Sequence, residues 1–137
     1  MIDPTPRWRY RFENFERALA SLNRGVALAK ASGLKEIERA GLLQTFNLAW
    51  DLAWKVLREF IEEEGRIVVQ PITPHATVRA AMEAGLIFDG QDWMDALETR
   101  NKIAHIHSLE MADEFLPEVE NRFAPMMSRF ADRLRGP

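Results

Sequence analysis

Titratable, cationic and amide side chains crowd together at one place in the sequence, where Arg100, Asn101, Lys102 and His105 are followed by His107. An arginine binds a phosphate group through two parallel hydrogen bonds. A histidine titrates near neutral pH and can take or give a proton. An asparagine can orient the imidazole or hold a substrate oxygen. These groups suffice for cleavage of RNA without a metal, with the ribose 2′-hydroxyl attacking, and equally for binding a nucleotide without reaction.

The spacing of these residues on a helix decides which of them can meet. Asn101 and His105 are four residues apart and share a helix face. Arg100 lies about 140° round from His105, at roughly 100° per residue. Its guanidinium therefore reaches the imidazole through its long side chain, or because the helix ends near Ala104. His107 joins the site only if the helix has ended before it.

The R-x4-H spacing also has an ordinary structural interpretation. Arg100 could pair with a surface acid such as Asp95 or Glu98, and His105 could cap the C-terminus of a helix. A motif of this length carries a high risk of chance matches. The pattern by itself therefore leaves a functional site and a structural ion pair both open.

Other candidate residues have two interpretations as well. Asp51 and Lys55 are four residues apart, which is typical of an exposed ion pair worth a few tenths of a kcal/mol, or of support for the site. Trp50, Trp54 and Trp93 could stack on nucleobases, but their helical spacing favours a core or an interface.

Helices must position these residues, because apolar side chains recur at three- and four-residue steps over most of the chain. An extended connection over Arg66–Ile72 is the one β-like stretch. The predicted helices run from Thr5-Pro6 to Gly33, from about Lys35 to Glu64, from Thr73-Pro74 to about Ala84, from the Gly85–Gly90 turn to near His105, and from Leu109 to Leu134.

The ends of the later helices carry their own signals. Asp89 and Asp92 resemble a capping arrangement, and Ser108 can cap the last helix. Pro117 and Pro125 lie inside that helix, and we expect a kink or a break at each. The predicted fold class is all-α, a single domain over residues 1–137. It is an antiparallel up-and-down four-helix bundle with a short extra helix.

Composition excludes several classes of function. The 137 residues carry a net charge of −3, which argues against a broad surface for duplex DNA. There is no cysteine, so disulfides and thiolate metal sites are impossible. No signal peptide and no apolar run of membrane-spanning length is found. We therefore expect a cytoplasmic protein that does not enter a membrane.

An ordered set of motifs supports the six-residue segment. The set comprises Arg11-Phe12 to Leu19, Gly41-Leu42-Leu43-Gln44 with Phe46, Asp51-Leu52-Ala53-Trp54-Lys55, Gly85-Leu86-Ile87 with Asp89-Gly90 and Trp93, and Arg100-Asn101 with His105. Over most of its length the chain resembles the HEPN superfamily (higher eukaryote and prokaryote nucleotide-binding domains). Within that superfamily it is most similar to the nucleotidyltransferase substrate-binding proteins, which are related to HepT toxins.

The resemblance implies a homodimer of helical bundles whose R-x4-H residues face a shared cleft. It implies a minimal nucleotidyltransferase as partner, and RNA or a nucleotide as the bound molecule. In toxin–antitoxin pairs of this type the HEPN protein is a metal-independent ribonuclease, so no cofactor is expected. The implied catalytic residues are Arg100, Asn101 and His105, and the supporting residues are Asp51, Lys55, Lys102 and His107.

The sequence departs from the family at two positions. The family motif ends in H-x-Y, and its partner can silence the toxin by adding AMP to that tyrosine. Here His107 stands in its place, and Tyr10 is the only tyrosine in the chain. AMP addition to a tyrosine at that position is therefore impossible. Asp51 stands where many relatives carry glutamate, and we expect it to contact Arg100 across helices.

Three hypotheses for function follow. The chain is a HEPN ribonuclease acting as a toxin, with Arg100, Asn101 and His105 as its working set. Alternatively, it is a non-catalytic subunit that binds nucleotide or substrate for a nucleotidyltransferase. In the third hypothesis it is a structural dimer that holds its partner. The intact arginine and histidine favour the first over the third.

Overall fold

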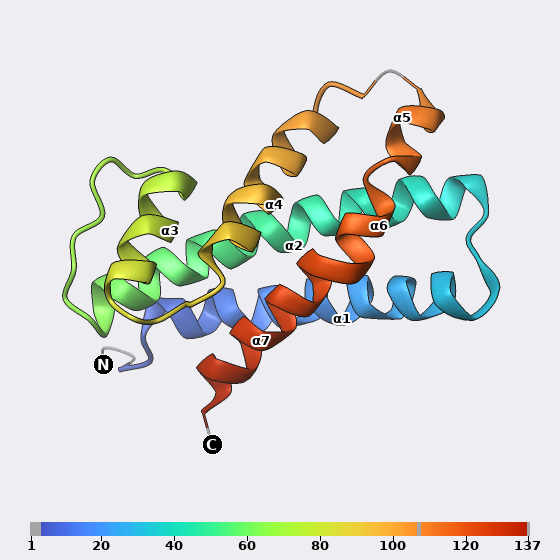
Figure 1. The fold of residues 1–137 in the computed structure, drawn as a ribbon. Coiled ribbons are helices and arrows are strands. Elements are labelled where there is room, and N and C mark those ends of the chain that lie inside the picture. Colours follow the sequence, from blue (N-terminus) through green and yellow to red (C-terminus); the bar gives the residue numbers. More distant parts are fainter. Residues whose placement is uncertain (1–3, 107, 137) are drawn as a thin grey trace.

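The computed structural model describes residues 4–106 and 108–136, and within these ranges every regular element is a helix (Figure 1). α1 and α2 form a long antiparallel hairpin, and α4 and the C-terminal helices cross it obliquely. The elements are α1 Arg7–Ser32, α2 Glu36–Glu63, α3 Pro74–Glu83, α4 Gly90–Ile103, α5 Leu109–Asp113, α6 Leu116–Glu118, the π-helix η1 Val119–Phe123 and α7 Ala124–Arg135.

The all-α class is confirmed over the described residues. The stricter prediction, an antiparallel up-and-down four-helix bundle with one short extra helix, stays a prediction. The stretch expected as one last helix is divided into α5, α6, η1 and α7. No described helix is long and apolar enough to span a membrane.

Aromatic side chains form the centre of the core. Trp50 of α2 packs on Trp93 of α4 with ring centroids 5.4 Å apart, and Trp93 meets Phe130 of α7 edge-on at 5.1 Å. Phe46 stacks on Phe123 at 5.6 Å. All five side chains are buried. Each Å² of apolar surface that they remove from water stabilises the fold by about 25 cal/mol. The interpretation of the buried tryptophans as core residues is therefore confirmed, and this core fixes α4 against α2.

Helix ends follow most of the predicted signals. The hydroxyls of Thr73 and Ser108 accept hydrogen bonds from backbone N–H groups of α3 and α5, so both are N-caps. Gly33 follows α1 with φ of +77°, a conformation that glycine adopts without strain. The prediction for Thr5-Pro6 needs a correction, because Pro6 itself occupies the cap position and α1 begins at Arg7.

The two prolines of the C-terminal stretch lie near changes in helix type. Pro117 falls in the first turn of α6, immediately after the break that follows α5. Pro125 lies at the start of α7, and the π-helical turn η1 precedes it. A proline removes one backbone donor and clashes with the carbonyl four residues back, and a break or a wider turn relieves both problems. The predicted break is confirmed near Pro117, whereas the helix continues from η1 through Pro125, where a kink stays a prediction.

The predicted capping role of Asp89 and Asp92 is wrong. Asp89 occupies the N-cap position of α4, but its side chain makes no capping hydrogen bond. Its Oδ2 instead accepts two hydrogen bonds from Arg129 of α7, at 3.1 and 2.8 Å. α4 starts at Gly90, where a Cβ atom would overlap the Met82 side chain, so glycine allows α3 and α4 to approach here.

Candidate functional site

The R-x4-H residues lie at the C-terminal end of α4. The helix ends at Ile103, and the N–H groups of His105 and Ile106 donate to the carbonyls of Lys102 and Ile103 at 3.0 and 3.2 Å. The side chains of Asn101 and His105 are exposed. The helix thus ends before His105, as one of the two expected geometries requires. His107 lies outside the described residues.

Arg100 is held by Asp51 across the α2–α4 contact. Its Nε and Nη2 donate to Asp51 Oδ1 and Oδ2 at 3.2 and 3.1 Å, so that two parallel hydrogen bonds join the guanidinium to the carboxylate. Each side chain is about one third exposed. The contact expected between these two residues therefore forms.

The alternative partners proposed for Arg100 are engaged elsewhere. Glu98 pairs with Lys102 at 3.1 Å on the solvent side of α4. Asp95 accepts a hydrogen bond from Arg122 of η1. Arg100 therefore pairs with neither of the two acids named on its own helix, and a structural ion pair with Asp51 stays open beside a functional role.

The two supporting lysines are not drawn into the Arg100–Asp51 pair. The Lys55 ammonium lies 6.0 Å from the centroid of the Trp54 ring, within range of a weak cation–π contact. The side chain of Lys102 is 59% exposed beside Glu98. The assignment of Lys55 and Lys102 to the site stays a prediction.

A groove of about 650 Å³ opens beside Arg100 between α2, the end of α4 and α5. Its volume is that of an ordinary small-molecule site. Leu43 of α2 and Ile103 of α4 contribute apolar surface, and Arg100 contributes a cation. Ala104 and Ile106 also line the groove, so the chain on both sides of His105 borders it. Of the predicted site residues, Arg100 lines the groove, and the assignment of the others to a site stays a prediction.

Gln44 and Asn47 place two amides in the groove wall. Asn47 Oδ1 is buried, and no described residue donates a hydrogen bond to it. An unpaired buried acceptor is rare in native proteins and calls for an explanation. Asn47 was not predicted from the sequence. The available signal was a polar residue one helical turn before Asp51, on the same side of α2.

A second charged cluster surrounds Arg122 near the middle of α4. Arg122 donates to Asp92 at 2.7 Å and to Asp95 and Glu118 at 2.5 Å. Hydrogen bonds from Arg122 and then from Gln91 hold the pKa of Asp95 below its usual range. The bonds to its carboxylates, that to Asp95 first, raise the pKa of Arg122. Three carboxylates share the Arg122 guanidinium, and Asp92 also contacts Arg129 at 3.5 Å, an arrangement typical of a structural clamp.

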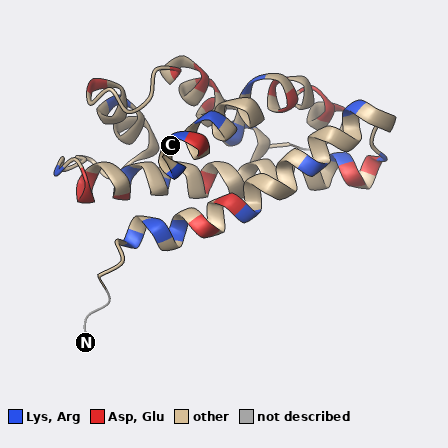
Figure 2. Cartoon of the chain, turned by 90° about the horizontal axis from the view of Figure 1, so that it is seen from below, with Lys and Arg blue, Asp and Glu red and all other residues tan. Residues whose placement is uncertain are grey.

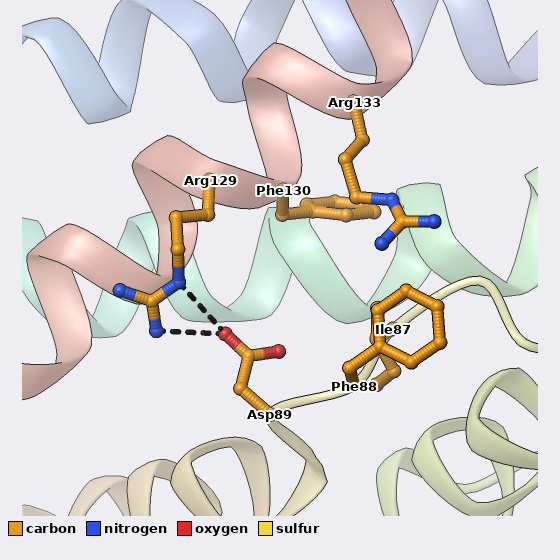
Figure 3. A pocket seen from close by; sticks show the side chains of 6 residues that line it. All are labelled: Ile87, Phe88, Asp89, Arg129, Phe130 and Arg133. Atoms are coloured by element: carbon orange, nitrogen blue, oxygen red, sulfur yellow. Dashed lines mark hydrogen bonds and ion pairs between the residues drawn. The ribbon is translucent and has the colours of Figure 1, made fainter.

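A second hollow, of about 380 Å³, lies at the other end of α4 (Figure 3). Arg129 reaches down from α7 to Asp89, and the Arg133 guanidinium lies 4.7 Å from the centroid of the Phe88 ring. Phe88 is 77% exposed. None of the predicted site residues lines this hollow.

Positions of Lys and Arg are interspersed with positions of Asp and Glu along the helices (Figure 2). Among residues 4–106 and 108–136, no group of three or more histidine, aspartate and glutamate side chains is placed to hold a metal ion.

The groove beside Arg100 brings together a cation, two amides and apolar surface. This set suits an organic anion with a polar ring.

The chain is thus a small helical protein with a ligand-sized groove beside Arg100. The family described as "nucleotidyltransferase substrate binding protein like" matches residues 10–136, so the chain belongs to that family. A solved crystal structure of a protein from Thermus thermophilus has the same fold, with a TM-score of 0.78 at 24% identity. That match covers 88% of this chain and 98% of the other. No curated protein matches the chain.

Proposed function

We propose that this protein is the helical partner of a minimal nucleotidyltransferase and that it cleaves RNA without a metal ion, as the toxin of a toxin–antitoxin pair. The description of its family refers to the binding of nucleotidyltransferase substrates, and this supports a partnership with a nucleotidyltransferase. One observation carries the proposal for its activity. Arg100 lines a ligand-sized groove that the chain on both sides of His105 also borders.

In the proposed reaction, the ribose 2′-hydroxyl attacks the adjacent phosphorus, and the bond from phosphorus to the 5′-oxygen of the next nucleotide breaks. His105 takes the proton from the 2′-hydroxyl and returns it to the departing 5′-oxygen. Arg100 binds the phosphate and the negative charge that develops on it. Asn101 orients the group beside the phosphate. The products are a 2′,3′-cyclic phosphate and a 5′-hydroxyl.

The remaining predicted residues have supporting roles in this proposal. Asp51 positions Arg100 through its two hydrogen bonds. Lys55, Lys102 and His107 bind the RNA strand around the scissile phosphate. A homodimer of HEPN-type four-helix bundles brings the motifs of two subunits to one cleft, and the protein acts in the cytoplasm.

A second candidate function is a non-catalytic subunit that binds nucleotide or substrate for its nucleotidyltransferase. One observation favours it. Both Asp51 oxygens already bind the Arg100 guanidinium, and no described residue forms a hydrogen bond with the His105 imidazole that would orient it. A general base in an assembled catalytic site is commonly oriented by such a partner. The groove serves either function.

The test is growth of cells on induction of the chain alone, with total RNA run on a gel. Wild type is compared with Arg100→Ala and His105→Ala. Arg24→Ala and His75→Ala serve as matched controls, because both of these side chains are exposed and lie outside the groove.

The ribonuclease proposal predicts growth arrest and degraded RNA for wild type and both controls, and neither effect for the two site variants. If all five folded proteins are harmless and the RNA stays intact, the catalytic proposal fails. Nucleotide binding that Arg100→Ala abolishes would then support the second candidate.

A further inference from the structure

The groove beside Arg100 contains a polar feature that phosphate binding does not use. Arg100 supplies the cation at one end of the groove, whereas Gln44 and Asn47 lie on α2 among apolar residues. A phosphate needs hydrogen-bond donors and positive charge. The carbonyl oxygen of an asparagine offers neither, so a phosphate would not satisfy Asn47 Oδ1.

Asn47 Oδ1 is buried, and no described residue donates to it. No hydrogen bond to a described residue fixes the Asn47 amide in its present orientation, so the amide can turn toward a ligand. A buried acceptor without a donor is an unmet demand for an N–H or O–H group. Among the side chains that line the groove, Leu43, Ile103 and Leu109 carry no donor. Gln44, Arg100 and Ser108 carry donors, but none of these bonds to Asn47 Oδ1.

A nucleobase has the shape and chemistry that this arrangement requires. Its faces are apolar enough to lie between aliphatic side chains, and its edge carries donors and acceptors. An asparagine amide pairs with adenine by accepting from its amine and donating to a ring nitrogen. Cytosine presents the same amine-and-nitrogen edge, whereas uracil and hypoxanthine present an oxo group where the amine would be.

The order of the groups along α2 fits a nucleotide. Asn47 and Asp51 are one helical turn apart and therefore neighbours on the helix surface. Asp51 holds Arg100 at this point. A base at Asn47 thus brings its sugar and phosphate toward Arg100, near the chain that carries His105.

We propose that the groove selects nucleotides whose base carries an exocyclic amine, adenine or cytosine, through Asn47 Oδ1. This proposal rests on the proposed function, because it assigns the base next to the phosphate that Arg100 binds. It adds a specificity residue, Asn47, to the site.

The test is isothermal titration calorimetry of the full chain with two matched pairs of nucleotides, AMP against IMP and CMP against UMP. Within each pair an amine is exchanged for an oxo group, so that phosphate, sugar and ring size are held constant. The proposal predicts that the amine-bearing member of at least one pair binds about three- to tenfold more tightly.

Four variants assign the effect. Asn47→Leu removes the acceptor and should make the two members of the pair equal. Asn47→Asp retains an acceptor and should keep the preference, although a second negative charge weakens binding of both members. Arg100→Ala should weaken both members alike and leave their ratio unchanged. Asn23→Leu, an exposed asparagine of α1, is the control and should behave as wild type.

Equal binding within both pairs, or preference for the oxo members, would overturn the proposal. A preference that survives in Asn47→Leu would overturn it too. In each case the proposed function would still be supported if Arg100→Ala weakens nucleotide binding or if the wild-type protein cleaves RNA. If no nucleotide binds while RNA is cleaved, Asn47 specificity fails alone. If neither binding nor cleavage occurs, both proposals fail.

Discussion

The two halves of α4 carry arginine–carboxylate contacts of different kinds. In the first half, Asp92 and Asp95 bind Arg122 from η1, and Arg122 also binds Glu118. In the second half, Arg100 has one carboxylate partner, Asp51, and lines a groove. Three carboxylates surround the first arginine, whereas the second has a single partner and a cavity beside it.

Under the proposed function, this difference separates a structural arginine, Arg122, from a functional one, Arg100. A guanidinium whose donors all meet carboxylates joins helices and has little capacity left for a ligand. Arg100 retains Nη1, which makes no hydrogen bond to a described residue, and a ligand in the groove can reach it. We infer that the first half of α4 holds the fold together, and that this frees the second half to bind and react.

The largest expected effect is the loss of RNA cleavage in His105→Ala. General acid–base catalysis contributes about 10²- to 10⁴-fold, so the cleavage rate should fall at least about 100-fold. Stability should stay unchanged, because the His105 side chain is exposed. Cleavage of a fluorescent RNA measures the rate, with His75→Ala as control. Full activity in His105→Ala would show that His105 is not a catalytic residue, and the proposed functional role of the second half of α4 would fail.

The next largest effect is on stability, in Arg122→Met. This change leaves Asp92, Asp95 and Glu118 facing one another without their shared cation. Because the Arg122 side chain is 34% exposed, solvent screens part of the loss, and we expect a decrease of roughly 1–2 kcal/mol in the free energy of unfolding. Urea unfolding measures it. Arg24→Met, an exposed arginine on α1, should change it by less than about 0.5 kcal/mol.

The pH dependence of stability sharpens the same point. Hydrogen bonds from Arg122 hold the pKa of Asp95 below its unfolded-state value in the native protein. A lowered pKa contributes stability above the unfolded-state pKa, about 3.9, and that contribution is lost as the pH falls through the native pKa. Asp95→Asn should therefore be less stable than wild type at pH 7. The difference should shrink below about pH 4.

Urea titrations at pH 7 and pH 3 measure this change. Asp132→Asn is the control, since the Asp132 side chain is 74% exposed. An Asp95→Asn deficit that is equally large at both pH values would show that charge at Asp95 does not hold the clamp.

The smallest effect is expected at Asp51, which acts through Arg100. Asp51→Asn keeps the shape of the side chain but replaces a charge-assisted pair of hydrogen bonds with a weaker one. We expect kcat for RNA cleavage to fall by about three- to tenfold, with little change in KM. Asp51→Glu should restore much of it. Faster cleavage by Asp51→Asn would mean that Asp51 blocks Arg100 instead of positioning it.

Local chemistry made much of the fold predictable. The caps at Thr73 and Ser108 and the break near Pro117 depend on groups within a few residues of each other. Asp89 shows the limit. Its spacing to Asp92 resembled a cap, but a partner 40 residues away, Arg129, takes its carboxylate. Residues close to Asp89 in the sequence cannot reveal this contact, because it forms only when α7 packs across α4.

The candidate site divides in the same way. Arg100, Asn101 and His105 could be found because they crowd together in the sequence. The Arg100–Asp51 contact followed from the family resemblance, since 49 residues separate the two. Asn47 and the groove were not predicted, because the cavity depends on how α5 packs beside α2 and α4. Asn47 becomes notable only when its oxygen is seen to be buried without a donor.

The most direct test replaces Arg100 or Arg122 with methionine, in two separate variants. RNA cleavage and thermal unfolding are measured on both. We predict that Arg100→Met loses cleavage and lowers the unfolding temperature less than Arg122→Met does, because it removes contacts to one carboxylate instead of three. Arg122→Met should unfold at a lower temperature and, below that temperature, still cleave RNA. If Arg100→Met cleaves RNA as wild type does, or loses as much stability as Arg122→Met, the assignment of Arg100 to function is contradicted.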